Sequence, residues 1–251
     1  MAGHLVTRGV VLRETDTKEA DKILTLLTEE RGKVSVIARG VRRKGCRYAA
    51  CAQPLAWSEW TLYQRGTWYY ADAGNTLELF QGLRNRLDAL ALGFYCAELA
   101  EAGAVEELPS PALLRHLLNG LYALSALGKS PALVKPAYEL KFLSVAGFEP
   151  LLDACAVCGN PHPAEPYLDL RQGVLRCRTC GQGGEPLDPD ALAAARHILY
   201  GEERRLYAFR LGEASLQRLT AASEAFLTVQ LDRTFRTLDF YKSLGNPSLH
   251  S

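Results

Sequence analysis

Apolar and polar residues alternate through the first 80 residues with a period of two, which is typical of β-strands. Valine, isoleucine, threonine and aromatic residues concentrate in five short stretches that turn-forming residues separate. We expect strands at residues 4–12, 22–28, 33–39, 54–63 and 67–73. Strands of this number and length predict a small closed barrel of the OB-fold type, with an SH3-like barrel or a small sandwich as the alternatives.

After Asn75 the apolar positions recur about every 3.6 residues, which predicts amphipathic helices. One apolar stripe covers residues 83–99 and a second covers 113–124. Ser110 and Pro111 fit the N-cap and the first residue of the second helix. Further helices are expected at residues 132–146, 189–199, 213–231 and 234–244.

Two Cys-X-X-Cys pairs lie in a segment rich in glycine and proline that interrupts the helical pattern. Cys155 and Cys158 form the first pair, Cys177 and Cys180 form the second, and 18 residues separate the pairs. This spacing is typical of a zinc site, because each short turn directs two thiolates to one ion. Four cysteine ligands close the coordination shell, so we expect one structural Zn²⁺. Redox pairs and unpaired cysteines are the alternatives.

The residues around the cysteines favour the structural interpretation. Gly159 and Gly181 directly follow the two pairs, where a knuckle turn tolerates a positive φ. Cys96 lies among apolar residues of a predicted helix and is expected to fill the core. Cys46 and Cys51 have no histidine or asparagine nearby in the sequence to complete a nucleophilic pair, so we interpret them as inert thiols.

Together these patterns predict an α+β protein with an N-terminal five-stranded OB-fold β-barrel, followed by an α-helical domain with an inserted four-cysteine zinc module. The expected parts are residues 1–80 for the barrel, 81–150 and 185–245 for the helical domain, 151–184 for the zinc-binding insertion and 246–251 for a C-terminal tail.

Composition excludes several classes of protein. The chain has 251 residues, of which 48% are hydrophobic and 23% charged, as in an ordinary globular protein. No apolar run approaches the ~20 residues that span a bilayer, and Arg8 and Arg13 interrupt the beginning of the chain, so we expect neither a membrane span nor a signal peptide. Seven cysteines without an export signal then indicate free or metal-bound thiols in the cytoplasm.

Positive charge is concentrated in one segment although the formal net charge is only +1. Residues 31–58 contain no acidic residue, and this segment joins two strands of the predicted barrel. Such a run is often only a solvated surface, but on an OB-fold it is also suited to binding phosphates. The candidate nucleic-acid-binding residues are Lys33, Arg39, Arg42, Arg43, Lys44, Arg47 and Tyr48.

Aromatic residues follow this segment closely and offer surfaces on which bases can stack. They are Trp57, Trp60, Tyr63, Trp68, Tyr69 and Tyr70. Strand alternation requires about half of them to face the barrel interior. Trp57 and Tyr63 share one face and Trp60 lies on the other, but the sequence does not determine which face is the core.

Motifs along nearly the whole chain occur in a specific order. They are Arg13-Glu14-Thr15-Asp16, Glu19-Ala20-Asp21-Lys22, Arg31-Gly32, Ala38-Arg39-Gly40-Val41-Arg42-Arg43-Lys44, Leu140-Lys141-Phe142-Leu143, Gly147-Phe148-Glu149-Pro150 and the Cys155/Cys158 pair. In this order they resemble the bacterial recombination mediator and DNA repair family RecO. The resemblance implies an OB-fold, a helical C-terminal domain and, in many members, a four-cysteine zinc module.

The resemblance also implies a function without enzymatic turnover. RecO-like proteins bind single- and double-stranded DNA, anneal complementary strands and cooperate with RecR to load RecA onto DNA coated by single-stranded DNA-binding protein. The implied partners are therefore DNA, RecR and the C-terminal tail of single-stranded DNA-binding protein, with no membrane and with a monomeric chain in the bacterial cytoplasm, at the nucleoid. The alternatives are an RNA-binding or transcription-associated scaffold with an OB-fold and a zinc ribbon and, less favoured, a nuclease or ligase.

Overall fold

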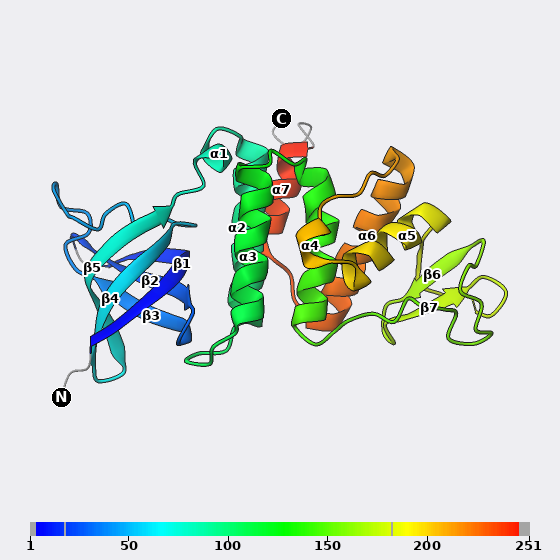
Figure 1. Ribbon diagram of the computed structural model, residues 1–251, viewed down its shortest axis with the longest axis horizontal. Helices are drawn as coiled ribbons and strands as arrows, with labels where there is room; N and C mark the ends of the chain where they lie inside the picture. Colours follow the sequence, from blue (N-terminus) through cyan, green and yellow to red (C-terminus); the bar gives the residue numbers. More distant parts are fainter. Residues whose placement is uncertain (1–3, 18, 182, 246–251) are drawn as a thin grey trace. The chain divides into compact units, whose positions relative to one another are not determined.

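A computed structural model describes residues 4–17, 19–181 and 183–245 (Figure 1). The chain divides into two units, Met1–Ala126 with Thr237–Ser251, and Leu127–Arg236. The expected domain boundaries stay a prediction, and the expected tail at 246–251 lies outside the described residues.

The N-terminal strands close into a barrel, as the sequence predicts. The strands are β1 (His4–Thr17), β2 (Asp21–Thr28), β3 (Gly32–Ala38), β4 (Trp57–Arg65) and β5 (Trp68–Glu78). Their order around the barrel is β1-β2-β3-β5-β4. Neighbouring strands are antiparallel except β3 and β5, which are parallel and thereby close the barrel. This arrangement confirms the OB-like fold class.

Inward-facing residues of all five strands fill the barrel. Trp60 is 0% exposed at its centre, so the face of β4 that carries Trp60 is the core face. Its neighbours include Val11, Leu24, Leu26, Val36, Leu62 and Tyr69. The outward face of β4 therefore carries Trp57 and Tyr63, both half-buried.

β1 is longer than predicted. The expected strand ended at residue 12 because the apolar alternation stops there. The structure continues it to Thr17, which pairs with Asp21 of β2, after a register shift between Val11 and Arg13. Backbone pairing with β2 extends a polar strand that hydrophobic periodicity cannot reveal.

Four helices belong mainly to the barrel's unit: α1 (Gln81–Arg84), α2 (Leu87–Gly103), α3 (Pro111–Ser125) and α7 (Arg236–Gly245). Most of α2 is buried, including Cys96, as expected. Two polar contacts involve α2, one with strand β1 of the barrel and one with helix α7. Arg13 of β1 donates to Glu101 of α2 at 2.9 Å, and the backbone N–H of Thr237 donates to Glu98 of α2 at 3.1 Å. Pro111 begins α3 as predicted, although Ser110 makes no side-chain cap.

The second unit contains α4 (Pro131–Val145), α5 (Pro189–Tyr200) and α6 (Glu213–Leu231), which agree closely with the expected helices. It also contains a short 3₁₀ helix that was not predicted, η1 (Glu203–Arg205). It also contains the short strands β6 (Pro166–Asp169), β7 (Val174–Cys177) and β8 (Glu185–Pro186), seen in part beside α5 in Figure 1. These strands have two to four residues, which is too short for a periodic signal in the sequence. Among the described helices, none is long and apolar enough to cross a membrane.

Candidate metal centre and nucleic-acid interface

The four cysteines of the two Cys-X-X-Cys pairs converge on one point. The sulfur atoms of Cys155, Cys158, Cys177 and Cys180 all lie within 4.8 Å of one another, and those of Cys158 and Cys177 are 3.7 Å apart. A tetrahedral ion with bonds of about 2.3 Å requires sulfur atoms about 3.8 Å apart. The cluster therefore has the dimensions and ligand set of a metal-binding site.

Local hydrogen bonds shape both turns of the cluster. The backbone N–H of Gly159 donates to the carbonyl of Cys155 at 2.8 Å, and that of Cys180 donates to the carbonyl of Cys177 at 3.0 Å. Gly159 has a φ of 72°, as predicted for a knuckle. The same prediction is wrong for Gly181, whose φ is not in the left-handed region. Here the chain stays close to the side chain of Arg176, 3.4 Å from the position of a Cβ.

The thiols of the cluster interact strongly. Backbone N–H groups, chiefly that of Cys158, stabilise the thiolate of Cys155 and lower its pKa to about 6. The sulfur atoms of Cys177 and Cys158 raise the pKa of Cys180 to about 12. Such a spread is expected when several thiols share one site, because each ionisation opposes the next until a cation neutralises them.

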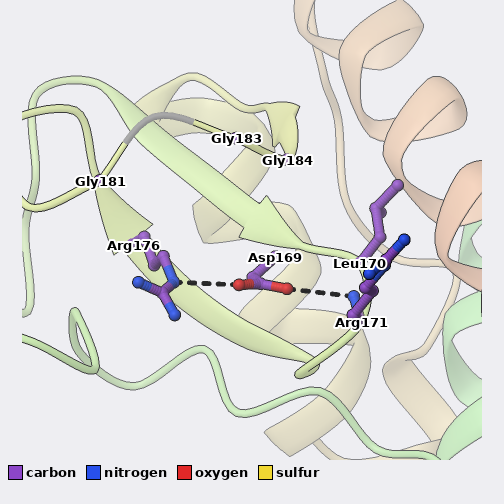
Figure 2. Close-up of a pocket in the computed structure, with 7 residues that line it drawn as sticks. All are labelled: Asp169, Leu170, Arg171, Arg176, Gly181, Gly183 and Gly184. Carbon is purple, nitrogen blue, oxygen red and sulfur yellow. Dashed lines mark hydrogen bonds and ion pairs between the residues drawn. The ribbon is translucent and has the colours of Figure 1, made fainter.

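A pocket of about 400 Å³ lies in the same segment, lined by residues that include Asp169, Arg176 and Gly181 (Figure 2). Its charged residues bind each other, since Arg176 Nε lies 3.0 Å from Asp169 Oδ2. Asp169 also accepts hydrogen bonds from the backbone N–H groups of Gln172 and Arg171, which lower its pKa. The pair holds the turn between β6 and β7, so we interpret the pocket as a structural feature of the metal module.

The loop between β3 and β4 presents most of the predicted cationic residues. We define this basic loop as residues 39–56. Five apolar residues anchor it to the protein: Val41, Cys51, Ala52, Leu55 and Ala56, each at most 6% exposed. Four cationic side chains are exposed between the anchors: Arg42, Arg43, Lys44 and Arg47. The loop is therefore a fixed support for clustered positive charge.

The remaining candidate residues have different positions. Arg42 forms an exposed ion pair with Asp16 at 3.2 Å, which partly offsets its charge. Lys33 lies near the opposite end of β3 from Arg39, and its ammonium donates to the backbone carbonyl of Glu101 at 3.3 Å. The structure thus gathers the candidates from Arg39 to Tyr48 and separates Lys33 from them.

Tyr48 connects the basic loop to the core of the barrel. Its hydroxyl donates to the carbonyl of Arg39 at 2.6 Å, and its ring packs edge-on against Trp60 at 6.3 Å. Burial is the main cause that raises the pKa of Tyr48 to about 12. Gly74 of β5 permits this close packing, because a Cβ there would lie 2.9 Å from the sulfur of Cys51.

Two of the aromatic residues that the sequence offered as stacking surfaces, but that were not among the candidate nucleic-acid-binding residues, face outward near the loop. Tyr63 and Tyr70 stack on the barrel exterior, with ring centroids 5.1 Å apart. Arg39 lies over the ring of Tyr70 at 4.7 Å. Strand register identifies the pair, because it places Tyr63 of β4 opposite Tyr70 of β5. The spacing of aromatic residues in the sequence does not give this register.

Comparison with known proteins gives matches over almost the whole chain. The family model described as recombination protein O N terminal matches residues 1–80, and that of the recombination protein O C terminal matches residues 84–239.

Individual relatives match over similar lengths. DNA repair protein RecO of Acetivibrio thermocellus is 29% identical over 244 residues, covering 96% of this chain and 97% of the relative. The protein of the same name from Symbiobacterium thermophilum is 31% identical over 242 residues, covering 94% and 96%. That of Anaeromyxobacter dehalogenans strain 2CP-C is 33% identical over 243 residues, covering 94% and 95%.

Proposed function

Because the chain belongs to the RecO family of DNA repair proteins, we propose that it binds single- and double-stranded DNA, anneals complementary strands and, with RecR, helps to load RecA onto DNA coated by single-stranded DNA-binding protein. The family is one of recombination mediators, and the proposed activity includes no covalent step. We place this activity in the bacterial cytoplasm, at the nucleoid, and expect the chain alone to be a monomer.

The observation that carries the proposal is the basic loop. Four exposed cationic side chains, those of Arg42, Arg43, Lys44 and Arg47, project from a support that buried residues hold to the barrel. Phosphate groups on two DNA strands repel each other, and cations placed between them reduce this repulsion. A fixed cationic loop therefore lowers the barrier to pairing without catalytic chemistry.

We propose Zn²⁺ as the ion of the four-cysteine cluster. Four thiolates at tetrahedral spacing are the ligand set that zinc prefers in structural sites, and they leave no position for water or substrate. The ion would cross-link two distant turns of the chain and stabilise the segment from 151 to 184. The role of this module is therefore to maintain the fold of the second unit.

The remaining partners follow from family membership. We propose RecR as the protein with which the chain acts, and the C-terminal tail of single-stranded DNA-binding protein as its contact on coated DNA. An acidic peptide tail binds best where cationic side chains border apolar surface. We place such a surface on the second unit, which consists of helices and the metal module.

An annealing assay tests the DNA-binding proposal. Two complementary fluorescent oligonucleotides are mixed with the purified protein without ATP, over a range of salt concentrations. The test variant is Arg42→Glu with Arg43→Glu. A matched control is Arg204→Glu with Arg205→Glu, which reverses two adjacent exposed arginines in the other unit.

We expect the intact protein and the control variant to accelerate annealing, and the test variant to lose most of the acceleration. The slope of log affinity against log salt for single strands should flatten by about 0.7 for each phosphate contact that is lost. No acceleration by the intact protein refutes the annealing proposal. Equal loss in both variants refutes the assignment to the basic loop, and tighter binding to RNA than to DNA favours an RNA-binding scaffold.

A further inference from the structure

A row of apolar and aromatic side chains crosses the outside of the barrel. Strand register places His4 opposite Tyr63, Tyr63 opposite Tyr70, Tyr70 opposite Ile37, and Ile37 opposite Ile23. All five side chains are exposed or half-buried. We call these five residues the aromatic row. Because Trp60, Leu62 and other inward residues already fill the core, the row is not needed for packing inside the barrel.

Two rings of this row stack on each other, and Arg39 covers one end of the stack. Tyr63 and Tyr70 are nearly parallel, with 12° between their planes and centroids 5.1 Å apart. The guanidinium of Arg39 covers Tyr70 at 4.7 Å from the ring centroid. Beyond Tyr63, the ring of His4 is 6.5 Å away and tilted by 55°, so it does not stack. The stack of Arg39, Tyr70 and Tyr63 therefore ends at Tyr63, whose side chain is half-buried.

The position of the row matches a known property of the fold. OB-fold proteins hold oligonucleotides on strands 2 and 3 and on the adjoining loops, including the loop between strands 4 and 5. Ile23 and Ile37 lie on β2 and β3, and the two tyrosines flank the turn between β4 and β5. The same row continues through Arg39 into the basic loop.

We propose that the aromatic row is a base-stacking site for single-stranded DNA, with an unpaired base stacked at the Tyr63 end of the row and Arg39 near the adjoining phosphates. The proposal rests on the proposed DNA-binding function and specifies the part of the strand that is recognised. Charge complementarity favours this occupant, because Arg39 of the basic loop contacts the row, while Arg42 is paired with Asp16. The further exposed cations of the same loop are Arg43, Lys44 and Arg47. Stacking is tolerant of sequence, because every base has a flat face.

The site has a consequence for annealing. A base that stacks on Tyr63 is held apart from its neighbours, while the cations of the basic loop bind the backbone. An incoming complementary strand can then pair with the exposed edges of the bases. The aromatic row therefore distinguishes single strands from duplexes, in which bases are already stacked, whereas the basic loop binds both.

Binding to a normal and to an abasic oligonucleotide of the same length tests the proposal. Both carry the same number of phosphates, so the difference in affinity reports contacts with bases. The test variant is Tyr63→Leu, the conservative variant is Tyr63→Phe, and the control is Tyr122→Leu, which removes an exposed ring from α3. Thermal unfolding of each variant checks that the barrel stays folded.

We expect the intact protein, Tyr63→Phe and Tyr122→Leu to bind the normal strand roughly five- to 150-fold more tightly than the abasic strand. Tyr63→Leu should lose this preference but keep its affinity for the abasic strand. Equal binding of both strands by the intact protein overturns the stacking site and leaves DNA binding intact. A preference that survives in Tyr63→Leu also overturns it, as does a change of oligomeric state in that variant. Binding of neither strand refutes the proposed function itself.

Discussion

A buried ionic cluster connects two helices of the second unit and allows a quantitative prediction. Lys135 of α4 is 3% exposed, and its ammonium lies 2.8 Å from Glu139 and 2.9 Å from Glu224 of α6. Glu139 is 0% exposed and also accepts a hydrogen bond from Ser223 at 2.6 Å. Removing the ammonium by Lys135→Met leaves the buried carboxylate of Glu139 without this cation.

The magnitude of the loss follows from the burial of the partners. Removing one member of a buried ion pair costs about 3–5 kcal/mol, because the other charge stays in a poorly solvated site. We expect Lys135→Met to lower the free energy of unfolding of the second unit by this amount at pH 7.5. The double variant Lys135→Met with Glu139→Met should recover most of the loss, because apolar residues of similar volume then fill the site.

The measurement must resolve the two units. All three tryptophans, Trp57, Trp60 and Trp68, lie in the barrel, so tryptophan fluorescence in a urea titration reports that unit alone. Hydrogen exchange of the α4 and α6 amides reports the second unit. The variant should lose protection in α4 and α6 while the fluorescence midpoint stays unchanged.

The pH dependence gives an independent check. Burial alone lowers the pKa of Lys135, but the carboxylates of Glu139 and Glu224 raise it above its usual value. The stabilisation from Lys135 is therefore complete at neutral pH and is lost only as alkaline pH passes the raised pKa. A loss below 1 kcal/mol at pH 7.5, or a deficit that does not shrink as alkaline pH passes the raised pKa of Lys135, refutes this reasoning.

Three further predictions concern the metal module and the barrel. Removal of the metal by a chelator, or the substitution Cys177→Ser, should abolish the hydrogen-exchange protection of residues 151–184 and leave the barrel strands protected. Elemental analysis of the untreated protein should find one zinc per chain. Loss of protection in both units would contradict a local structural role. Trp60→Ala should cost about 3–5 kcal/mol in a urea titration of the barrel followed by circular dichroism, because its 0% exposed ring leaves a cavity. Gly74→Ala should destabilise the barrel by about 1–3 kcal/mol in the same titration, and Cys51→Ala should relieve part of this cost by removing the sulfur that the new methyl group meets; additive losses would show that the contact is not responsible.

Sequence reasoning succeeded where one physical signal dominates. The alternation that buries Val34 and Val36 on β3 and Leu62 on β4 is the same signal that predicts the strands. Cysteine spacing predicted the cluster because a metal site imposes short turns. Helix boundaries in the second unit were predicted to within a few residues, because proline and glycine mark several of them.

The features that the sequence did not reveal depend on pairing between distant residues. The polar second half of β1 is a strand because it hydrogen-bonds to β2, as in the pair Asp16 and Lys22. Gly181 has no positive φ, and the side chain of Arg176 lies beside it. The stack of Tyr63 and Tyr70 requires the register of β4 against β5, and the half-buried position of Tyr48 requires its contact with Trp60. None of these contacts is encoded in local periodicity.

The distribution of charge bears on how an annealing factor releases its product. A protein with a net charge of +1 has a weak long-range field, so its attraction for DNA depends on local contacts at the basic loop. Each phosphate contact adds a limited, salt-dependent increment, and the five exposed cations of the basic loop limit the number of such contacts there. Under the proposed function, base stacking adds affinity only while the strand is single. Once pairing is complete, the stacking contribution is lost and only the weaker phosphate contacts hold the duplex. Under the proposed function, the combination of a small cationic loop and an aromatic row thus favours binding of single strands and release of the paired product.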